Sequence, residues 1–473
     1  MSWLPRSYLQ FGDTLQSESS QSPPTSNSST GHLSCPQTSE NTLSSPPRPS
    51  AGLCPQSGLE LVEDEPIPIV LVQGFLGTPG VFSWDNHVYK HHSTSENSGS
   101  RRQVIVPSVG PVSSLHDRAC ELFYALVGGI VDYGIKHSIL HKHDRYGRHV
   151  SDGLYPRWSK LRPLHFVGHS IGGPTIIKLQ YLLAQGFFGE EYHPDMILSL
   201  SAVCAPFRGT QLVYTLGEST TSAPAVRFIS VGNFLAKVVH VLAYLSPILP
   251  AALDVHADAR RLSYHDIGLR ELLKHFWRSD WAESHDAAPF DMTFEASDDR
   301  EACGEGVVYS NTFYRSYVSI TVFPRFSHLI PFEAGPSTSA IRDFDFDALV
   351  PKPSFCASDA KASNTAPLEE VRLEAGLGPS SNFLGDEYRL NDGVVPVFSQ
   401  WHPLQCSATS CQHYSDGHYQ YKPFVQPGVW AVTTTHGSNH LSLIPSPIWG
   451  SSFQKSFWPE LLCWLDEIEK RLR

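Results

Sequence analysis

Basic residues are scarce in this 473-residue sequence, since 35 Lys and Arg stand against 47 Asp and Glu and give a net charge of −12 with histidine neutral. This deficit argues against nucleic acid, or an anionic membrane, as an electrostatic partner. Charged residues make up only 17% of the chain, whereas 41% of the residues are hydrophobic and 11% are aromatic. A chain that is disordered throughout is therefore excluded, because this composition supplies a sizeable core.

The nine cysteines include no CxxC pair and are widely scattered. This pattern predicts neither a disulfide framework nor a cysteine zinc site. Cys406 and Cys411 are the only close pair, and a local bridge between them in a loop is an alternative.

Long apolar runs are also missing. Met1–Gln16 reads MSWLPRSYLQFGDTLQ and lacks the apolar run of a secretory signal, which predicts a cytoplasmic protein. The longest apolar stretch, Phe228–Leu253, is interrupted by Asn233, Lys237, His240 and two prolines. We therefore expect no transmembrane span, although this stretch could rest against a lipid surface.

The composition changes along the chain. Ser, Pro, Thr, Gln and Asn dominate from about Asp13 to Ser57, which predicts a disordered leader over 1–64 and one folded domain over 65–473. Within that domain, short apolar runs alternate with helical patterns, which predicts an α/β fold with a mostly parallel sheet covered by helices on both faces. The expected strands are the run that begins at Ile67, Gln103–Pro107, Leu164–Val167, Ile197–Val203, Tyr317–Val322 and Trp430–Thr434. The expected helices are His116–Ile130, Pro174–Gln185, Phe228–Leu245 and Phe457–Arg473.

One of the expected strands runs into a glycine-flanked serine. Residues 164–186 read LHFVGHSIGGPTIIKLQYLLAQG, which is an apolar strand, a GxSxG turn centred on Ser170, and a helix. This order is typical of a nucleophile elbow, in which a strained turn holds the serine hydroxyl clear of the sheet at the positive end of a helix. Ser170 is therefore the candidate nucleophile.

A serine nucleophile requires a histidine base and a carboxylate that orients the base. Asp392 lies in an Asn-Asp-Gly turn beside an apolar run and is the candidate acid, although an ordinary Asp-Gly turn explains the local pattern equally well. Of the five histidines after Asp392, only His436 and His440 follow a strand-like run, and local reasoning does not separate them. The other three are His402, His413 and His418.

Two backbone N–H groups are needed to hold an oxyanion, one from the residue after the nucleophile and one from the loop after the first strand. These positions are Ile171 and Phe75, and the glycines in Gln73–Gly77 would let the backbone approach a substrate closely. An ordinary glycine turn is the alternative.

A longer and more specific pattern lies between the first strand and the elbow. It reads VGPVSS from Val109, DRACE from Asp117, LVGG from Leu126 and VDYG from Val131, and continues to His137 and His143. On these residues the sequence resembles the zinc-containing lipases of thermoalkalophilic bacilli and the staphylococcal lipases, with gaps, from about Ile67 to the C-terminus. The resemblance implies an α/β-hydrolase fold with a lid helix and a zinc-bearing insertion.

The resemblance also implies roles for particular residues. It matches Ser170 to the nucleophile, Asp392 to the acid and His440 to the base, with His436 as the second choice. The oxyanion donors of the family fall on Phe75 and Ile171.

A structural zinc ion is the cofactor that the resemblance implies, and the matched ligands are Asp117, His137, His143 and Asp258. Two imidazoles and two carboxylates suit tetrahedral zinc, and a full shell leaves no open position for catalysis. Asp258 is matched through the sequence DVHAD, but the segment after it lacks the tryptophan of the family. Local spacing alone would instead pair His137 with His141, one helical turn away.

Two further features of the family bear on this chain. Calcium is not expected, because Ser442 and Pro447 occupy the positions of the acidic calcium ligands. The lid region corresponds to about 206–250, where Val226–Leu245 is amphipathic and would contact a lipid interface transiently. Its apolar side is expected to hold Phe234, Leu235, Val238, Val239 and Leu242.

The sequence therefore predicts a serine lipase that hydrolyses carboxylic ester bonds of lipids, with acylglycerols as the favoured substrates. A phospholipase, a short-chain esterase and an acyl transferase use the same machinery and are alternatives. A zinc-stabilised lipid-binding or scaffold protein of the same fold, without turnover, is the alternative from another class.

Overall fold

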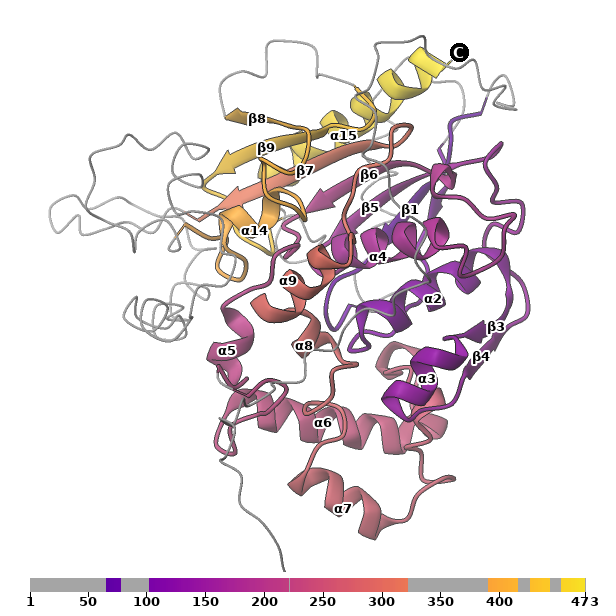
Figure 1. The fold of residues 1–473 in the computed structure, drawn as a ribbon, viewed down its shortest axis with the longest axis vertical. Coiled ribbons are helices and arrows are strands. Elements are labelled where there is room, and N and C mark those ends of the chain that lie inside the picture. Colours follow the sequence, from indigo (N-terminus) through magenta and orange to yellow (C-terminus); the bar gives the residue numbers. More distant parts are fainter. Residues whose placement is uncertain are drawn as a thin grey trace, which may run out of the picture. The chain divides into compact units, whose positions relative to one another are not determined.

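The computed structural model describes residues 65–77, 102–220, 222–321, 390–415, 426–442 and 452–472, so the predicted leader lies outside the described residues. A seven-stranded sheet has the order β2-β1-β5-β6-β7-β9-β8, and all the strand pairs described in it are parallel (Figure 1). The predicted mostly parallel sheet is thus confirmed. The strands are β1 Ile69–Val72, β2 Val104–Ile105, β5 Leu164–His169, β6 Ile197–Val203, β7 Phe313–Ile320, β8 Cys411–Ser415 and β9 Trp430–His436.

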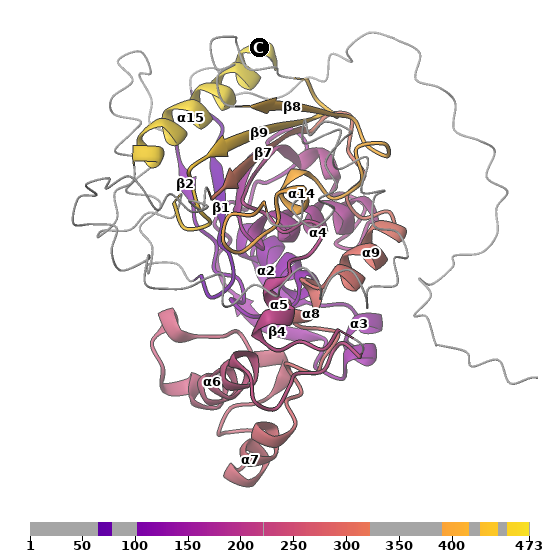
Figure 2. The same cartoon turned by 90° about the vertical axis from the view of Figure 1, so that its left-hand side faces the viewer.

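Both faces of the sheet are buried, which explains why β1 reads as a continuous apolar run. Val70 and Val72 pack into the cluster that contains helices α2 (Leu115–Val127) and α4 (Gly172–Ala184). Ile69 and Leu71 point to the opposite face, where they pack into the cluster that contains α15 (Ser452–Leu472). Figures 1 and 2 show α15 on the side of the sheet opposite α2 and α4. Alternate side chains of one strand therefore anchor two separate helical layers.

The helix predicted over His116–Ile130 ends at Val127, because Gly128 and Gly129 have φ angles of 88° and 109°. Glycine adopts such angles without steric cost, so the chain turns there. It continues as a small antiparallel pair of strands, β3 (Gly129–Asp132) and β4 (Tyr146–Val150), which the helical pattern concealed. Helix α3, Ile135–His141, lies between the two strands in the sequence.

The predicted lid region contains α5 (Leu212–Leu216) and α6 (Val231–Leu245), and α6 packs against α7 (Leu269–Trp277). The apolar side that we expected on α6 is divided, because Val239 is buried whereas Phe234 is 64% exposed. In the part of the chain that the structure describes, Val231–Ile248 alone is long and apolar enough to cross a membrane by length and composition. That finding is weak evidence for a span, since an amphipathic helix with one packed face passes the same test.

The segment between α14 (Val397–Trp401) and β9 contains β8, which pairs with β9 at the edge of the sheet. The remaining helical elements are η1 Pro194–Met196, η2 Ser246–Ile248, η3 Ala251–Leu253, η4 Asp258–Arg260, α8 Ala288–Asp291, α9 Phe294–Ala302 and α14 Val397–Trp401.

Just beyond β7, the N–H of Thr321 donates a hydrogen bond of 2.9 Å to the carbonyl oxygen of Asn391. Residues 322–389 lie between these two positions, outside the described residues. The two ends of that stretch are thus fastened to each other.

Candidate functional site

Ser170 lies at the sharp turn between β5 and α4, where the elbow pattern predicts it. Its φ angle is 54°, a left-handed conformation that is costly for a residue with a Cβ. The turn is held because the N–H of Ser170 donates to the carbonyl oxygen of Val203, at 2.9 Å, and the N–H of Gly173 donates to that of Ser170, at 3.0 Å. The backbone of Ser170 is thus fixed from two sides at the start of α4.

The glycines on either side of Ser170 are required by close backbone packing. A Cβ on Gly168 would lie 2.6 Å from the carbonyl carbon of Gly172. A Cβ on Gly172 would lie 2.2 Å from the carbonyl oxygen of Val72, at the end of β1. The GxSxG spacing therefore allows the first turn of α4 to contact two neighbouring strands.

Gly172→Ala is expected to lower the free energy of unfolding by about 1–3 kcal/mol, because the new methyl group collides with the backbone of β1, which cannot move aside as a side chain can. Thermal unfolding would measure this loss. Gly268→Ala is the matched control, since a Cβ there meets nothing within 4 Å. Equal stability of the two variants would contradict the packing argument.

Asp392 and His440, from separate loops, meet in a buried pair. The Nδ1 of His440 lies 2.8 Å from the Oδ2 of Asp392, and the N–H of His440 donates to the carbonyl oxygen of Asp392 at 2.9 Å. The other carboxylate oxygen of Asp392 accepts from the N–H groups of Val394 and Val395, at 2.9 and 2.7 Å. Gly393, within this turn, takes a φ angle of 94°, which glycine adopts without steric cost. The acid is thus oriented before it meets the imidazole.

The structure distinguishes the two candidate bases. His436 ends β9 and is exposed, whereas His440 is 6% exposed and bonded to Asp392. His169, the neighbour of Ser170, places its Nε2 3.0 Å from the carbonyl oxygen of His440, which brings the His440 loop against the elbow. Burial and the nearby His440 lower the pKa of His169 to about 3, so its ring stays neutral.

Cys204 is a buried neighbour of the pair that sequence reasoning did not single out. Its Sγ lies within 4.8 Å of the side-chain ligand atoms of Asp392 and His440. Burial, together with the charge of Asp392, raises the pKa of the Cys204 thiol well above its usual value. The protonated thiol donates to the Oγ of Ser319, at 3.3 Å.

The loop after β1 contacts the elbow directly. A Cβ on Gly74 would lie 2.9 Å from the Cβ of Ser170, so only glycine permits this approach. No described residue accepts a hydrogen bond from the N–H of Phe75 or of Ile171, the two predicted oxyanion donors. Both groups thus keep their donor capacity near Ser170.

A buried arginine, Arg118, holds the loop after β1 in place through hydrogen bonds. Arg118 donates from Nη2 to the carbonyl oxygen of Gln73, at 2.5 Å, and from Nη1 to that of Gly110, at 2.6 Å. Its Nε donates to the hydroxyl of Thr175 on α4, at 2.9 Å. Burial lowers the pKa of Arg118 to about 10, which still leaves the guanidinium charged at neutral pH.

Three of the four predicted zinc ligands gather beside α2 and α3, together with Asp286. The ligand atoms of Asp117, His137, His143 and Asp286 all lie within 4.8 Å of one another. His137 Nε2 is 3.2 Å from one oxygen of each aspartate, and His143 Nε2 is 3.4 Å from Asp286 Oδ2. Ligands about 2.0–2.1 Å from a tetrahedral zinc ion would be about 3.4 Å apart.

The donor atoms of this group fit a metal ion in a second respect. One atom from each residue is buried without a hydrogen bond, namely Asp117 Oδ1, His137 Nε2, His143 Nε2 and Asp286 Oδ1. Such orphaned polar atoms are costly unless a ligand satisfies them. The Nδ1 of His143 lies 2.8 Å from the carbonyl oxygen of Asp144, which directs the lone pair of Nε2 toward the group.

The match of Asp258 to the fourth ligand is corrected by the structure. The side chain of Asp258 is 47% exposed and pairs with Arg148, whose Nε donates to it at 2.9 Å. Asp286, from the irregular segment after α7, occupies the fourth position instead. The missing tryptophan after Asp258 was the sequence signal against it. Trp281, five residues before Asp286 in the sequence, donates to the carbonyl oxygen of Val112 at 3.0 Å.

The group does not contain the alternative pair of His137 and His141, since His143 supplies the second imidazole.

No calcium ligand was expected at Ser442 or Pro447. The structure describes Ser442, whereas Pro447 lies outside the described residues.

A second group of residues that could hold a metal ion includes two of the cysteines. It consists of His402, Cys406, Cys411 and His413. The group contains no CxxC pattern, but its two histidines and two cysteines all lie within residues 402–413. No disulfide joins Cys406 to Cys411.

Known proteins with similar sequences are lipases. Residues 65–229 match the family model described as "Lipase-like, C-terminal domain". Lipase 2 of Staphylococcus aureus is 25% identical over 409 residues, and Lipase 1 of the same species is 26% identical over 407 residues. Each alignment covers 80% of this chain and 50% of the relative, so the chain spans about half the length of these proteins. The chain is similar to the staphylococcal lipases.

Solved structures support this similarity at the level of the fold. The Staphylococcus hyicus lipase superposes with a TM-score of 0.58 at 21% identity, covering 86% of this chain and 96% of that chain. EstA from Clostridium botulinum superposes with a TM-score of 0.53 at 22% identity, covering 85% and 87%. The predicted α/β-hydrolase fold is therefore confirmed, as is the resemblance to staphylococcal lipases.

Proposed function

We propose that this protein is a serine lipase that hydrolyses carboxylic ester bonds of lipids through an acyl-enzyme. The observation that carries the proposal is the buried hydrogen bond between His440 and Asp392, in a loop held against the strained elbow of Ser170. A left-handed serine, next in the chain to a histidine that contacts the loop of an oriented imidazole, is costly to maintain and favours a catalytic site over a scaffold.

In the proposed reaction, the Oγ of Ser170 attacks the ester carbonyl while His440 removes its proton. Asp392 holds the imidazole in the required tautomer and stabilises the imidazolium that forms. The N–H groups of Phe75 and Ile171 stabilise the oxyanion. His440 then protonates the departing alcohol, and a water molecule activated by the same histidine releases the fatty acid.

Apolar side chains beside the site support a lipid ester over a polar one. Phe75 and Leu76, in the oxyanion loop, are 37% and 50% exposed, and Leu441, next to the base, is 56% exposed. Exposed apolar side chains of this size are costly in water and suit an acyl chain. We further propose that the exposed face of α6, with Phe234, contacts the lipid interface as part of a lid.

A fluorophosphonate probe followed by a substrate survey tests the proposal. We expect labelling of Ser170 in the unmodified protein and none after Ser170→Ala. Activity on p-nitrophenyl esters of increasing chain length, emulsified triglycerides and phospholipid vesicles would then separate a lipase from a short-chain esterase or a phospholipase. The absence of labelling in folded protein would favour the lipid-binding alternative.

A structural zinc ion at Asp117, His137, His143 and Asp286 is a further part of the proposal. The ion would fasten α2 and α3 to the segment after α7, and a closed shell supplies no catalytic position. Two neutral imidazoles and two carboxylates match zinc in charge and ligand type.

Asp286→Asn is expected to remove one metal equivalent per chain and to lower Tm by about 5 °C or more, since bound metal stabilises only the folded state. Elemental analysis and calorimetry measure the two effects. Asp258→Asn is the matched control, because that carboxylate pairs with Arg148 instead. Loss of metal in the control alone would restore the sequence-based ligand set.

A further inference from the structure

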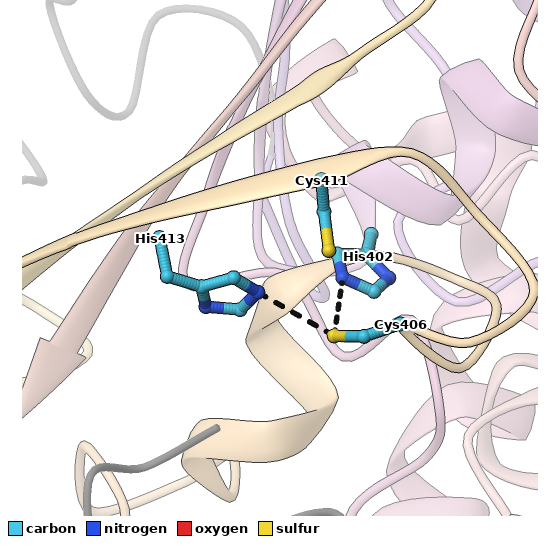
Figure 3. A group of neighbouring side chains, drawn as sticks. All are labelled: His402, Cys406, Cys411 and His413. Carbon is cyan, nitrogen blue, oxygen red and sulfur yellow. Dashed lines mark hydrogen bonds between the residues drawn. The ribbon is translucent and has the colours of Figure 1, made fainter. Parts of the chain in front are cut away.

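Four side chains converge between the end of α14 and β8. This strand forms the edge of the sheet opposite β2. The four residues are His402, Cys406, Cys411 and His413, and one ligand atom from each lies within 4.8 Å of the others (Figure 3). His402 is buried, and both cysteines are half-buried and outside any disulfide. This group shares no residue with the site of Ser170 or with that of Asp117.

The distances fit a tetrahedral metal ion. Cys406 Sγ lies 3.2 Å from His402 Nε2 and 3.4 Å from His413 Nε2. Zinc bonds of about 2.3 Å to sulfur and about 2.0–2.1 Å to nitrogen place the two ligand atoms about 3.6 Å apart. The side chains would therefore move by only a few tenths of an ångström to accept the ion.

The hydrogen bonding of His402 also suits the binding of a cation. The Nδ1 of His402 lies 2.6 Å from the carbonyl oxygen of Leu404, so the ring N–H donates there and the lone pair of Nε2 points toward Cys406. This arrangement is the usual support of a metal-binding histidine.

Strand geometry explains how two ligands come from β8. Cys411 and His413 are two residues apart, so their side chains project from the same face of the strand. The other two ligands, His402 and Cys406, come from the chain that leads from α14 to this strand. We propose that these four residues bind one structural zinc ion in a closed Cys2His2 shell.

The ion would hold residues 402–413, which follow α14 in the segment that begins at Asp392. Gln400 of α14 donates to the carbonyl oxygen of Val395 at 2.9 Å, and the N–H of Val395 donates to Asp392 at 2.7 Å. The connection at 403–410 contributes few buried apolar side chains, so packing alone holds it weakly. The zinc ion would add a cross-link between this connection and the edge strand β8.

Metal counting in protein purified without chelators tests the proposal. Replacing both Cys406 and Cys411 with serine should remove one zinc equivalent per chain, whereas the matched double change of the exposed Cys303 and Cys463 to serine should remove none. Cobalt-loaded protein should show thiolate-to-cobalt absorption in the near ultraviolet. That absorption should persist after Asp286→Asn and vanish without Cys406 and Cys411.

Alkylation of the unmodified protein provides a test that needs no variant. With metal bound, Cys406 and Cys411 should resist alkylation while Cys303 and Cys463 react, and a strong chelator should expose the first pair. An unchanged zinc count in the Cys406/Cys411 double variant, or a Cys406–Cys411 disulfide without metal in freshly purified protein, would overturn the proposal. Neither readout depends on ester hydrolysis, so the outcome is independent of the proposed lipase activity.

Discussion

Ser170→Ala is expected to lower kcat for ester hydrolysis by about 10⁴- to 10⁶-fold, because the change removes the hydroxyl that forms the acyl-enzyme in the proposed reaction. The residual rate would come from binding and from the two N–H groups of the oxyanion loop. Initial rates on a p-nitrophenyl ester, with burst-phase measurement of acyl-enzyme, would quantify the loss.

The control for this variant is Ser201→Ala. Ser201 is fully buried on β6, so the change also removes a buried hydroxyl from the sheet. It should leave kcat close to that of the unmodified protein. Comparable loss in both variants, or activity retained in Ser170→Ala, would refute the assignment of the nucleophile.

His440→Ala should reduce kcat by a comparable factor of about 10⁴–10⁶, since the serine hydroxyl is a weak nucleophile without a base. Because His440 Nδ1 is bonded to Asp392 Oδ2, Nε2 is the atom that would accept the proton of Ser170 in the proposed reaction. Single-turnover kinetics would show whether the acylation step itself is slowed.

His436→Ala is the matched comparison, because this histidine is exposed at the end of β9, only four residues before His440. It should change kcat by less than about twofold, as surface changes away from a site usually do. A large loss in His436→Ala with a mild loss in His440→Ala would reverse the assignment of the base.

Much of the fold could be predicted because the signals are local. Residues 69–72 and 164–169 read as buried strands, and the turn at Ser170 follows from its glycine neighbours. β8 could not be predicted in this way, because CQHYS is short and lacks apolar alternation, and it is stabilised by pairing with β9.

The site was predictable to a different extent in its different parts. Ser170 and Asp392 lie in turns with their own sequence patterns, whereas the choice between His436 and His440 required a resemblance. Asp286 carries no local pattern, since it reaches the candidate metal site only through the folding of the segment after α7. A residue that tertiary structure brings to a site leaves little trace in the spacing along the chain.

The hydrogen bond between Thr321 and Asn391 has a consequence for how this chain can diverge. The bond holds the chain together at Thr321 and at Asn391, next to the turn that contains Asp392. We therefore expect Asp392 to keep its place in variants that have a different number of residues between these two positions.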